Sequence, residues 1–414
     1  MCWIAACLAY TVPDPDTRRR LGWTAGAPAS RRHPDMYSTS RWILDAAMSP
    51  PTRKLEHIRA DIDRIDRELV RLLNERARHA GDAALAKRAR DGDDTPMYRP
   101  DRESQLLRRI VGLNTGPLPT ADVQRILAEV VSACRALELP LSVAFLGPAG
   151  TYTQAAAIKH FGHGVSTVAQ GTIDAVFREV ESGSCDFGVV PVENSTEGVV
   201  NHTLDMFVSS NLSICGEVMI PIHHCLMSAA PALAQVQRVC SHQQSLAQCR
   251  KWLDANLPQV ERAPVSSNAE AARLASLDPG VAAIAGRVAA ELYGLPVLVS
   301  NIEDEPDNTT RFLVIGHQRV APSGDDKTAV MFWFRDRPGG LFQAIEVFAR
   351  RGMNMTRIES RPSRLQRWTY VFYVDFVGHR DEEAVREALE ELAQRTDFCK
   401  VIGSFPRAVT EETA

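Results

Sequence analysis

The chain has 414 residues, and its 47 Lys and Arg residues are nearly balanced by 51 Asp and Glu residues. This length accommodates two to four ordinary domains, and the balanced charge excludes the global basic surface of a nucleic-acid-binding protein. Nine scattered cysteines without a C-x-x-C pair indicate reduced thiols, and no apolar run approaches the roughly 18–20 residues that span a bilayer. We therefore expect a cytoplasmic protein without a nucleic-acid or membrane partner.

The first fifty residues do not show the pattern of a folded domain. MCWIAACLAYTV is apolar but lacks a basic leading segment, and TRRRLGWTAGAPASRRHPD resembles neither a helix nor a strand. A secretory signal of this composition would be poorly formed. We expect residues 1–50 to be a disordered leader or a mis-assigned start, with Met48 the better initiator because helical periodicity begins soon after it.

Residues 51–140 are expected to form an all-helical domain. Apolar residues from Leu55 to Leu72 recur at spacings of 3 and 4, which predicts a helix with a heptad-like seam that continues to about Arg90. Two more helices are expected over about 99–113 and 120–138. Arg76 and Lys87 lie near the apolar stripe, although such side chains are rarely buried unless paired. Either the helix end is solvated, or an anion binds inside a helical bundle.

Arg59 lies beside the same seam, 17 residues before Arg76. That separation is roughly 25 Å along a helix axis. One small ligand cannot contact both arginines of a single helix, so a site that uses both must take Arg59 from a second chain. The spacing therefore predicts that such a site would be shared within a dimer.

Residues 141–318 alternate strands with helices, which predicts an α/β layered domain. Polar loops stand between strand ends and helix starts: GPAGTYT (147–153), VENSTEG (192–198), SHQQS (241–245) and SSN (266–268). Capping alone explains such residues in a single loop, but four of them favour a shared anion-binding crevice. No Walker loop, dinucleotide fingerprint or metal-ligand spacing occurs, so we expect no cofactor and no metal.

The segment DNTTRFLVIG (307–316) ends this domain. Asp, Asn and Thr favour a turn, and FLVIG is typical of a buried strand, so a loop before a strand is one interpretation. The other interpretation is a functional site, because Arg311 interrupts what could be a longer hydrophobic segment, beside two hydroxyls.

Residues 327–406 show a β-α-β-β-α-β pattern, the ferredoxin-like arrangement, and 407–414 are expected to be a tail. Gly339 and Gly340 permit close backbone approach at a helix start, where an anion can rest. The segment ESRP (359–362) adds a strand-terminating Pro362 and a charged pair, Glu359 and Arg361. Such a pair is ordinarily just exposed, but strand propensity does not explain the segment well.

The motifs of the three regions resemble known families. LEHIRADIDRIDRELVRLLNER, a following lysine, YRPDRE and EVVSACRALE, in order over about 53–139, resemble the all-helical chorismate mutases. FLGPAGTYTQAA, VVPVENSTEGVV, SHQQSLAQC, SSNAEAA and NTTRF, over about 141–317, resemble prephenate dehydratase. That family's fold is similar to two-lobed, periplasmic-binding-protein-like domains with the active site in the cleft. GGLFQAI and IESRP resemble the ACT domain, an α+β domain that senses phenylalanine in these enzymes.

The resemblance to the mutases implies a role for each charged residue of the helical domain. Arg76 and Arg59 of the partner subunit would bind the two carboxylates of chorismate, and Lys87 would donate to the ether oxygen. Glu103 would hold the ring hydroxyl, with Arg102 in support.

Glu138 stands where many relatives have a glutamine that also donates to the ether oxygen. A glutamate donates only when it is protonated, so we expect mutase activity that falls as the pH rises through neutrality.

The resemblance to prephenate dehydratase implies that six residues lie in the cleft: Glu193, Asn194, Ser241, Gln248, Thr310 and Arg311. Prephenate would lose CO2 and its ring hydroxide to give phenylpyruvate. Arg311 would grip a carboxylate, and Thr310 would hydrogen-bond or relay a proton to the departing hydroxyl.

The resemblance to the ACT domain implies an L-phenylalanine site formed by Gly339, Gly340, Leu341, Glu359, Ser360, Arg361 and Pro362. Such sites form between two chains, which implies a homodimer or homotetramer. The leading hypothesis is a bifunctional enzyme of phenylalanine biosynthesis that converts chorismate to prephenate and then to phenylpyruvate, with feedback by L-phenylalanine. The alternatives are dehydration of arogenate and a non-catalytic amino-acid-binding regulator; the intact charged residues argue against the regulator.

Overall fold

The computed structural model describes residues 54–92, 98–363 and 369–408. The expectations for residues 1–50 and for 409–414 of the tail lie outside these ranges. Three helices form the first region: α2 (Leu55–Asp91), α3 (Pro100–Leu113) and α4 (Thr120–Glu138). Their bounds agree closely with the apolar spacing. Within the described ranges, none of the helices is both long and apolar enough to cross a membrane.

Local sequence explains where the second helix begins. Pro100 occupies the first turn of α3, and Asp101 and Glu103 place negative charge there. Proline fits this position because it has no N–H group to leave unpaired, and acidic side chains complement the helix dipole. The chain divides into two units after Glu68, inside α2, and the second unit begins at Leu69.

The first lobe of the α/β domain is built on a mixed sheet with the strand order β2-β1-β3-β11-β5, and β4 pairs with β3. β1, β2 and β3 are parallel, whereas β11 is antiparallel to both β3 and β5. The elements are β1 (Ser142–Leu146), α5 (Tyr152–Phe161), β2 (Ser166–Gln170), α6 (Ile173–Glu181), β3 (Phe187–Asn194), β4 (Gly198–Val199), α7 (Asn201–Ser209), β5 (Ser213–Pro221) and β11 (Thr309–Gly316).

The second lobe has its own sheet with the order β10-β6-β9-β7-β8. All five residues of β9 are buried, as expected for a strand covered on both faces. Its elements are β6 (Cys225–Met227), η2 (Leu233–Gln235), β7 (Arg238–His242), α8 (Gln243–Gln248), α9 (Arg250–Asn256), β8 (Glu261–Val265), α10 (Asn268–Leu277), β9 (Val281–Ala285), α11 (Arg287–Tyr293) and β10 (Val297–Val299). The chain passes between the lobes twice, from β5 to β6 and from β10 to β11, so two segments join them.

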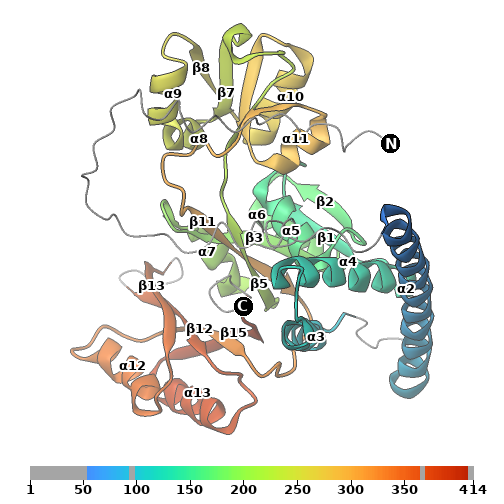
Figure 1. The fold of residues 1–414 in the computed structure, drawn as a ribbon. Helices are drawn as coiled ribbons and strands as arrows, with labels where there is room; N and C mark the ends of the chain where they lie inside the picture. Colours follow the sequence, from blue (N-terminus) through green and yellow to red (C-terminus); the bar gives the residue numbers. More distant parts are fainter. Residues whose placement is uncertain (1–53, 93–97, 364–368, 409–414) are drawn as a thin grey trace, which may run out of the picture. The chain divides into compact units, whose positions relative to one another are not determined.

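The last region has the predicted β-α-β-β-α-β order and a sheet with the order β13-β14-β12-β15. Helices α12 and α13 pack beside each other against this sheet (Figure 1). The core between the helices and the sheet contains four fully buried side chains: Val330, Phe332, Phe348 and Leu392. The elements are β12 (Asp326–Trp333), α12 (Gly340–Arg350), β13 (Met355–Pro362), β14 (Tyr370–Val377), α13 (Glu383–Arg395) and β15 (Phe398–Pro406).

Candidate functional site

Four of the charged residues expected in the helical domain lie near one another. Arg76 and Lys87 are half-buried on α2, whose side chains are mostly exposed. The charge of Arg76 acts on the carboxyls of both Glu103 and Glu138, and the charge of Lys87 acts on Glu138. Two cations from α2 therefore lie within electrostatic range of one carboxyl from α3 and one from α4.

The other two expected residues are Arg59 and Arg102. Arg59 belongs to the part of α2 that precedes Glu68, which forms a separate unit. Arg102 is exposed on α3, beside Glu103.

Burial affects both carboxyls of this cluster. Loss of hydration raises the pKa of Glu103, while the positive charges of Arg135 and Arg76 act in the opposite direction. Loss of hydration likewise raises the pKa of Glu138 against the effects of Lys87 and Arg135. A raised pKa favours the protonated form, in which a carboxyl can donate a hydrogen bond.

Sequence reasoning missed Arg135. This residue of α4 is buried, and its guanidinium donates to the Glu103 carboxylate and to the Phe161 carbonyl. Arg135 precedes Glu138 by one helical turn, so the two side chains share a face of α4. This shared face was the sequence signal that Arg135 lies near the site. An arginine on a helix is ordinarily exposed, so the signal alone does not predict its burial.

A second candidate site is a cavity of about 490 Å³ between the lobes of the α/β domain. All four loops that the sequence singled out contribute to its lining, through Gly150–Thr153, Glu197–Gly198, His242 with Gln244–Ser245, and Ser266–Asn268. Asn194, Gln248 and Thr310 also line it. The expected convergence of these loops on one crevice is therefore confirmed.

Asn194 orients the hydroxyl of Thr310. Its side-chain amide donates to Thr310 Oγ1 at 2.8 Å and to Asn308 Oδ1 at 2.7 Å. The amide oxygen accepts from the backbone N–H groups of Thr196 and Glu197, which fixes the direction of the amide. Because Thr310 Oγ1 already accepts a hydrogen bond, its own proton is available to a group in the cavity.

Polar side chains bridge the two lobes across the cavity. Gln248 of the second lobe donates to Glu197 of the first lobe at 3.2 Å, and its side-chain oxygen lies 2.9 Å from His224 Nε2. The other ring nitrogen of His224 lies 3.1 Å from the Tyr152 hydroxyl. Burial lowers the pKa of His224, so the ring is neutral and serves as a hydrogen-bonding link.

Ser241 lies behind the cavity wall rather than in it. The side chain is fully buried, and Oγ lies 2.9 Å from Asn268 Oδ1 and 2.6 Å from the Ile284 carbonyl. Asn268 itself lines the cavity. The position expected for Ser241 is therefore corrected: Ser241 holds a cavity residue in place.

The structure also corrects the position expected for Arg311. Its guanidinium points away from the cavity and is buried against two carboxylates, with Nε 2.8 Å from Glu217 Oε2 and Nη1 2.6 Å from Asp375 Oδ2. Burial opposes the charge of Arg311, but Asp375 and Glu217 outweigh it and raise its pKa above the ordinary value. Lys327 Nζ also contacts Glu217, at 3.0 Å. Arg311 thus joins the first lobe to β14 of the last domain.

The position expected for Glu193 is corrected as well: Glu193 precedes Asn194 in β3 but does not line the cavity. Its Oε2 lies 3.1 Å from Arg357 Nε, on β13 of the last domain. Adjacent residues of a strand point to opposite faces of the sheet, so Glu193 and Asn194 cannot both face the cavity.

The residues expected in an effector site lie at the start of α12 and on β13. Gly339 has φ 78° directly before α12, and a Cβ on Gly340 would lie 2.5 Å from the Phe334 ring, so both positions require glycine. In β13 burial alternates, with Glu359 and Arg361 on the more buried face and Ser360 and Pro362 on the exposed face. Leu341 of α12 is exposed as well.

Arg361 binds the first lobe of the α/β domain. Its guanidinium lies 3.0 Å from Asp205 Oδ1 and donates to the Asn201 carbonyl, both on α7. The four residues of ESRP are therefore not gathered on one surface.

Comparisons with known proteins match all three regions. The family model of chorismate mutase type II matches residues 58–139, that of prephenate dehydratase matches 143–320, and that of the ACT domain matches 328–394. The chain is 51% identical over 359 residues to a bifunctional chorismate mutase/prephenate dehydratase of Pseudomonas aeruginosa, covering 86% of this chain and 98% of that protein. It is 46% identical over 366 residues to the enzyme of the same name from Aquifex aeolicus, covering 87% and 99%.

Solved structures agree with this. A prephenate dehydratase of Arthrobacter aurescens in complex with L-Phe is similar to 66% of this chain and 94% of its own, with 34% identity and a TM-score of 0.60.

The position of Arg311 predicts a stability defect rather than a binding defect. Arg311→Met removes the cation between two buried carboxylates, and breaking a buried pair in this way costs about 3–5 kcal/mol. We expect a marked drop in the thermal unfolding midpoint. Arg319→Met is the matched control, because Arg319 pairs with Asp381 in solvent, where such a pair contributes below about 1 kcal/mol. A raised KM for prephenate at an unchanged unfolding midpoint would contradict this prediction.

Proposed function

Because the chain belongs to the family of bifunctional chorismate mutase/prephenate dehydratases and carries both activities, we propose which of its residues perform each reaction and that L-phenylalanine controls the second. The helical region rearranges chorismate to prephenate, and the two-lobed domain converts prephenate to phenylpyruvate, CO2 and water. The observation that supports this assignment most directly is the Asn194-oriented Thr310 hydroxyl in a cavity lined by the four polar loops.

The rearrangement of chorismate requires a compact substrate conformer and stabilisation of charge on the breaking C–O bond, but no nucleophile. Arg76 binds a carboxylate, and Lys87 donates to the ether oxygen. Glu103 accepts a hydrogen bond from the ring hydroxyl. Glu138 in its protonated form is the second donor to the ether oxygen, a role that its raised pKa supports. Arg102, which is exposed, supports Glu103 only indirectly.

The second carboxylate of chorismate is assigned to Arg59 of the partner subunit. Leu69, Val70, Leu72 and Leu73 are exposed on α2, and a second copy of the helix would cover them. The large apolar side chains Leu341, Phe342 and Ile358 are exposed in the last domain and provide a second surface of the same kind. Surfaces like these favour self-association, so the proposal includes a homodimer or homotetramer.

In the dehydratase cleft, aromatisation of the ring drives the reaction, and the protein needs to help hydroxide leave. The Thr310 hydroxyl lies in the cavity with its proton available, so it hydrogen-bonds or relays a proton to the leaving hydroxyl. Since Arg311 is engaged elsewhere, the first turns of α5 and α10 supply N–H groups to the substrate carboxylates. Thr151 and Ser267 cap these helices, and both residues line the cavity.

Feedback by L-phenylalanine is proposed to act through the last domain. The Arthrobacter aurescens prephenate dehydratase was solved with L-Phe bound. In this chain, Arg357 of β13 pairs with Glu193, the neighbour of Asn194. Within the described residues, Nη2 of Arg357 is buried without a hydrogen-bond partner. Such an incompletely satisfied contact is a suitable element to rearrange when an effector binds near β13.

The two reactions are tested by supplying chorismate and measuring phenylpyruvate by its ultraviolet absorbance in alkali. We expect the wild type to form phenylpyruvate and Thr310→Val to accumulate prephenate, with dehydratase turnover lowered by about 10²-fold or more. Thr309→Val, the same change one residue earlier, should leave both steps intact. Wild-type turnover by Thr310→Val would refute the role of Thr310. Parallel assays with arogenate determine which of the two substrates is preferred.

The mutase should lose activity as the pH rises through the raised pKa of Glu138. The carboxyl is protonated and can donate below this pKa, and it becomes an acceptor above it. Glu138→Gln keeps a donor at every pH and should flatten the profile. Asp122→Asn, an exposed change on the same helix, should retain the wild-type slope. A flat wild-type profile would contradict the proposed donor role.

Arg357→Met should weaken feedback. We expect L-phenylalanine to lower wild-type dehydratase activity and the variant to need at least about 5-fold more effector for half-inhibition. Arg351→Met is the control, because Arg351 pairs with Glu391 inside the last domain. No response of the wild type up to millimolar L-phenylalanine would reject feedback. Unchanged inhibition of Arg357→Met would reject only the route through Glu193.

A further inference from the structure

Helix α4 of the mutase region rests directly on the dehydratase domain. The loop after α5 passes so close to α4 that a Cβ on Gly162 would lie 2.4 Å from Ser132 Cβ, and one on Gly164 would lie 2.6 Å from the Ser132 carbonyl oxygen. Gly162 also has φ 73°, and Gly164 N–H donates to Ser132 Oγ at 3.0 Å. Glycine at both positions is therefore required for this backbone contact.

Arg135 carries this contact into the mutase site. Its guanidinium donates with one nitrogen to the Glu103 carboxylate and with another to the carbonyl of Phe161, the last residue of α5. The guanidinium carbon also lies 4.9 Å from the centre of the Tyr98 ring. The side chain is only 6% exposed, so its charge depends on these partners in place of water. A planar guanidinium can satisfy all three at once, which an ammonium cannot.

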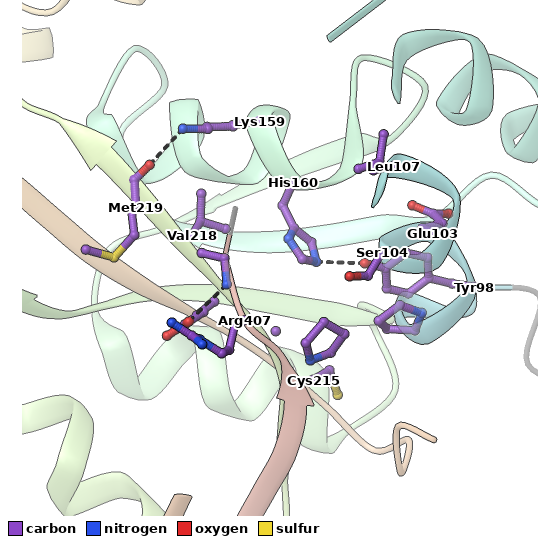
Figure 2. A pocket seen from close by; sticks show the side chains of 15 residues that line it. Tyr98, Glu103, Ser104, Leu107, Lys159, His160, Cys215, Val218, Met219 and Arg407 are labelled. Carbon is purple, nitrogen blue, oxygen red and sulfur yellow. Dashed lines mark hydrogen bonds between the residues drawn. The ribbon is translucent and has the colours of Figure 1, made fainter. Parts of the chain in front are cut away.

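The Tyr98 ring that supports Arg135 is itself anchored to the dehydratase domain. Its hydroxyl lies 2.7 Å from Nε2 of His160, and Figure 2 shows the two side chains joined at the wall of a cavity of about 190 Å³ that Glu103 also lines. Burial and the charge of Arg135 lower the pKa of His160 to about 3, and burial raises the pKa of Tyr98. Both groups are therefore neutral and keep their protonation state at any pH near neutrality.

We propose that Arg135 is a positioning residue of the mutase reaction, which orients the Glu103 carboxylate and is itself held by the end of α5 in the dehydratase domain. This inference rests on the proposed function of Glu103 as acceptor for the substrate's ring hydroxyl. It makes the second domain a structural part of the first active site.

The charges around Glu103 determine what loss of Arg135 does. Arg135 and Glu138 of α4 and Arg76 of α2 act on the Glu103 carboxyl, and Lys159 and His160 of α5 line the adjoining cavity. The charge of Arg135 lowers the pKa of Glu103, and without it Glu103 takes up a proton at higher pH and no longer accepts as a carboxylate.

Arg135 also lowers the pKa of Glu138. Removing the guanidinium therefore moves both limbs of the mutase pH profile to higher pH. A residue with a purely structural role would not cause this shift.

The test uses the full-length chain and three variants: Arg135→Leu, Arg135→Lys and the control Arg125→Leu, which changes an exposed arginine of the same helix. We expect Arg135→Leu to lower mutase kcat/KM by about 10²-fold, the effect of displacing a catalytic group by about 1 Å. Its pH profile should move to higher pH. Arg135→Lys retains the charge and should recover part of the rate without the shift. Arg125→Leu should match the wild type.

Dehydratase activity of the same variants reports whether the chain is folded. If Arg135→Leu also loses dehydratase activity, this variant is misfolded. The test then compares Arg135→Lys in the wild-type background with Arg135→Lys in the Glu103→Gln background, because a glutamine at 103 does not titrate. In the Glu103→Gln background, Arg135→Lys should have a much smaller effect on mutase kcat than it has in the wild-type background. Equal effects in both backgrounds, or a rate loss without any profile shift in Arg135→Leu, would overturn the inference. A wild type without mutase activity would instead overturn the proposed function.

Discussion

The pairing of β3 with β11 is the constraint on which the dehydratase site depends. In this antiparallel pair Thr310 lies opposite Asn194, and Arg311 lies opposite Glu193. Successive side chains of a strand point to opposite faces, so one pair faces the cavity and the other faces the last domain. The Thr310 hydroxyl and the Asn194 amide occupy the face that lines the cavity. The same backbone therefore fixes a hydrogen-bonded polar pair on one side and an attachment on the other.

The attachment consists of buried charges, and that choice has consequences. Arg311 lies between Glu217 and Asp375, and Lys327 adds a second cation on Glu217. Desolvation offsets much of the attraction in such a group, so it adds little net stability, yet removing one member leaves a charge unpaired and costs several kcal/mol. Buried ion pairs of this kind tolerate little misalignment. They fix β13 and β14 of the last domain against the strands that carry Asn194 and Thr310.

The sequence predicted the three regions, the helix bounds of the first region and the four loops of the cleft, because these depend on local periodicity and on turn and capping residues. The motifs also indicate the cleft for Arg311 and Glu193, but a motif does not show which face of a strand a side chain occupies. Alternation along β11 and β3 places Arg311 on the opposite face from Thr310 and Glu193 on the opposite face from Asn194. Arg135 is a different case. Its burial results from Phe161, Tyr98 and Glu103, which come together only when α3 packs on α4 and α4 meets the end of α5. No spacing within one helix reveals such a contact.

The connection between the two enzymes explains why that contact can be built into the mutase site. Helix α4 ends at Glu138 and β1 begins at Ser142, so only residues 139–141 separate them. Three residues span at most roughly 11 Å, too little for a flexible linker between independent domains. The last helix of the mutase is therefore held next to the start of β1, beside the loop after α5. Arg135 can then orient the Glu103 carboxylate of α3 while it donates to the main-chain carbonyl of Phe161 in the dehydratase domain. The two active sites therefore share structural elements as well as a chain.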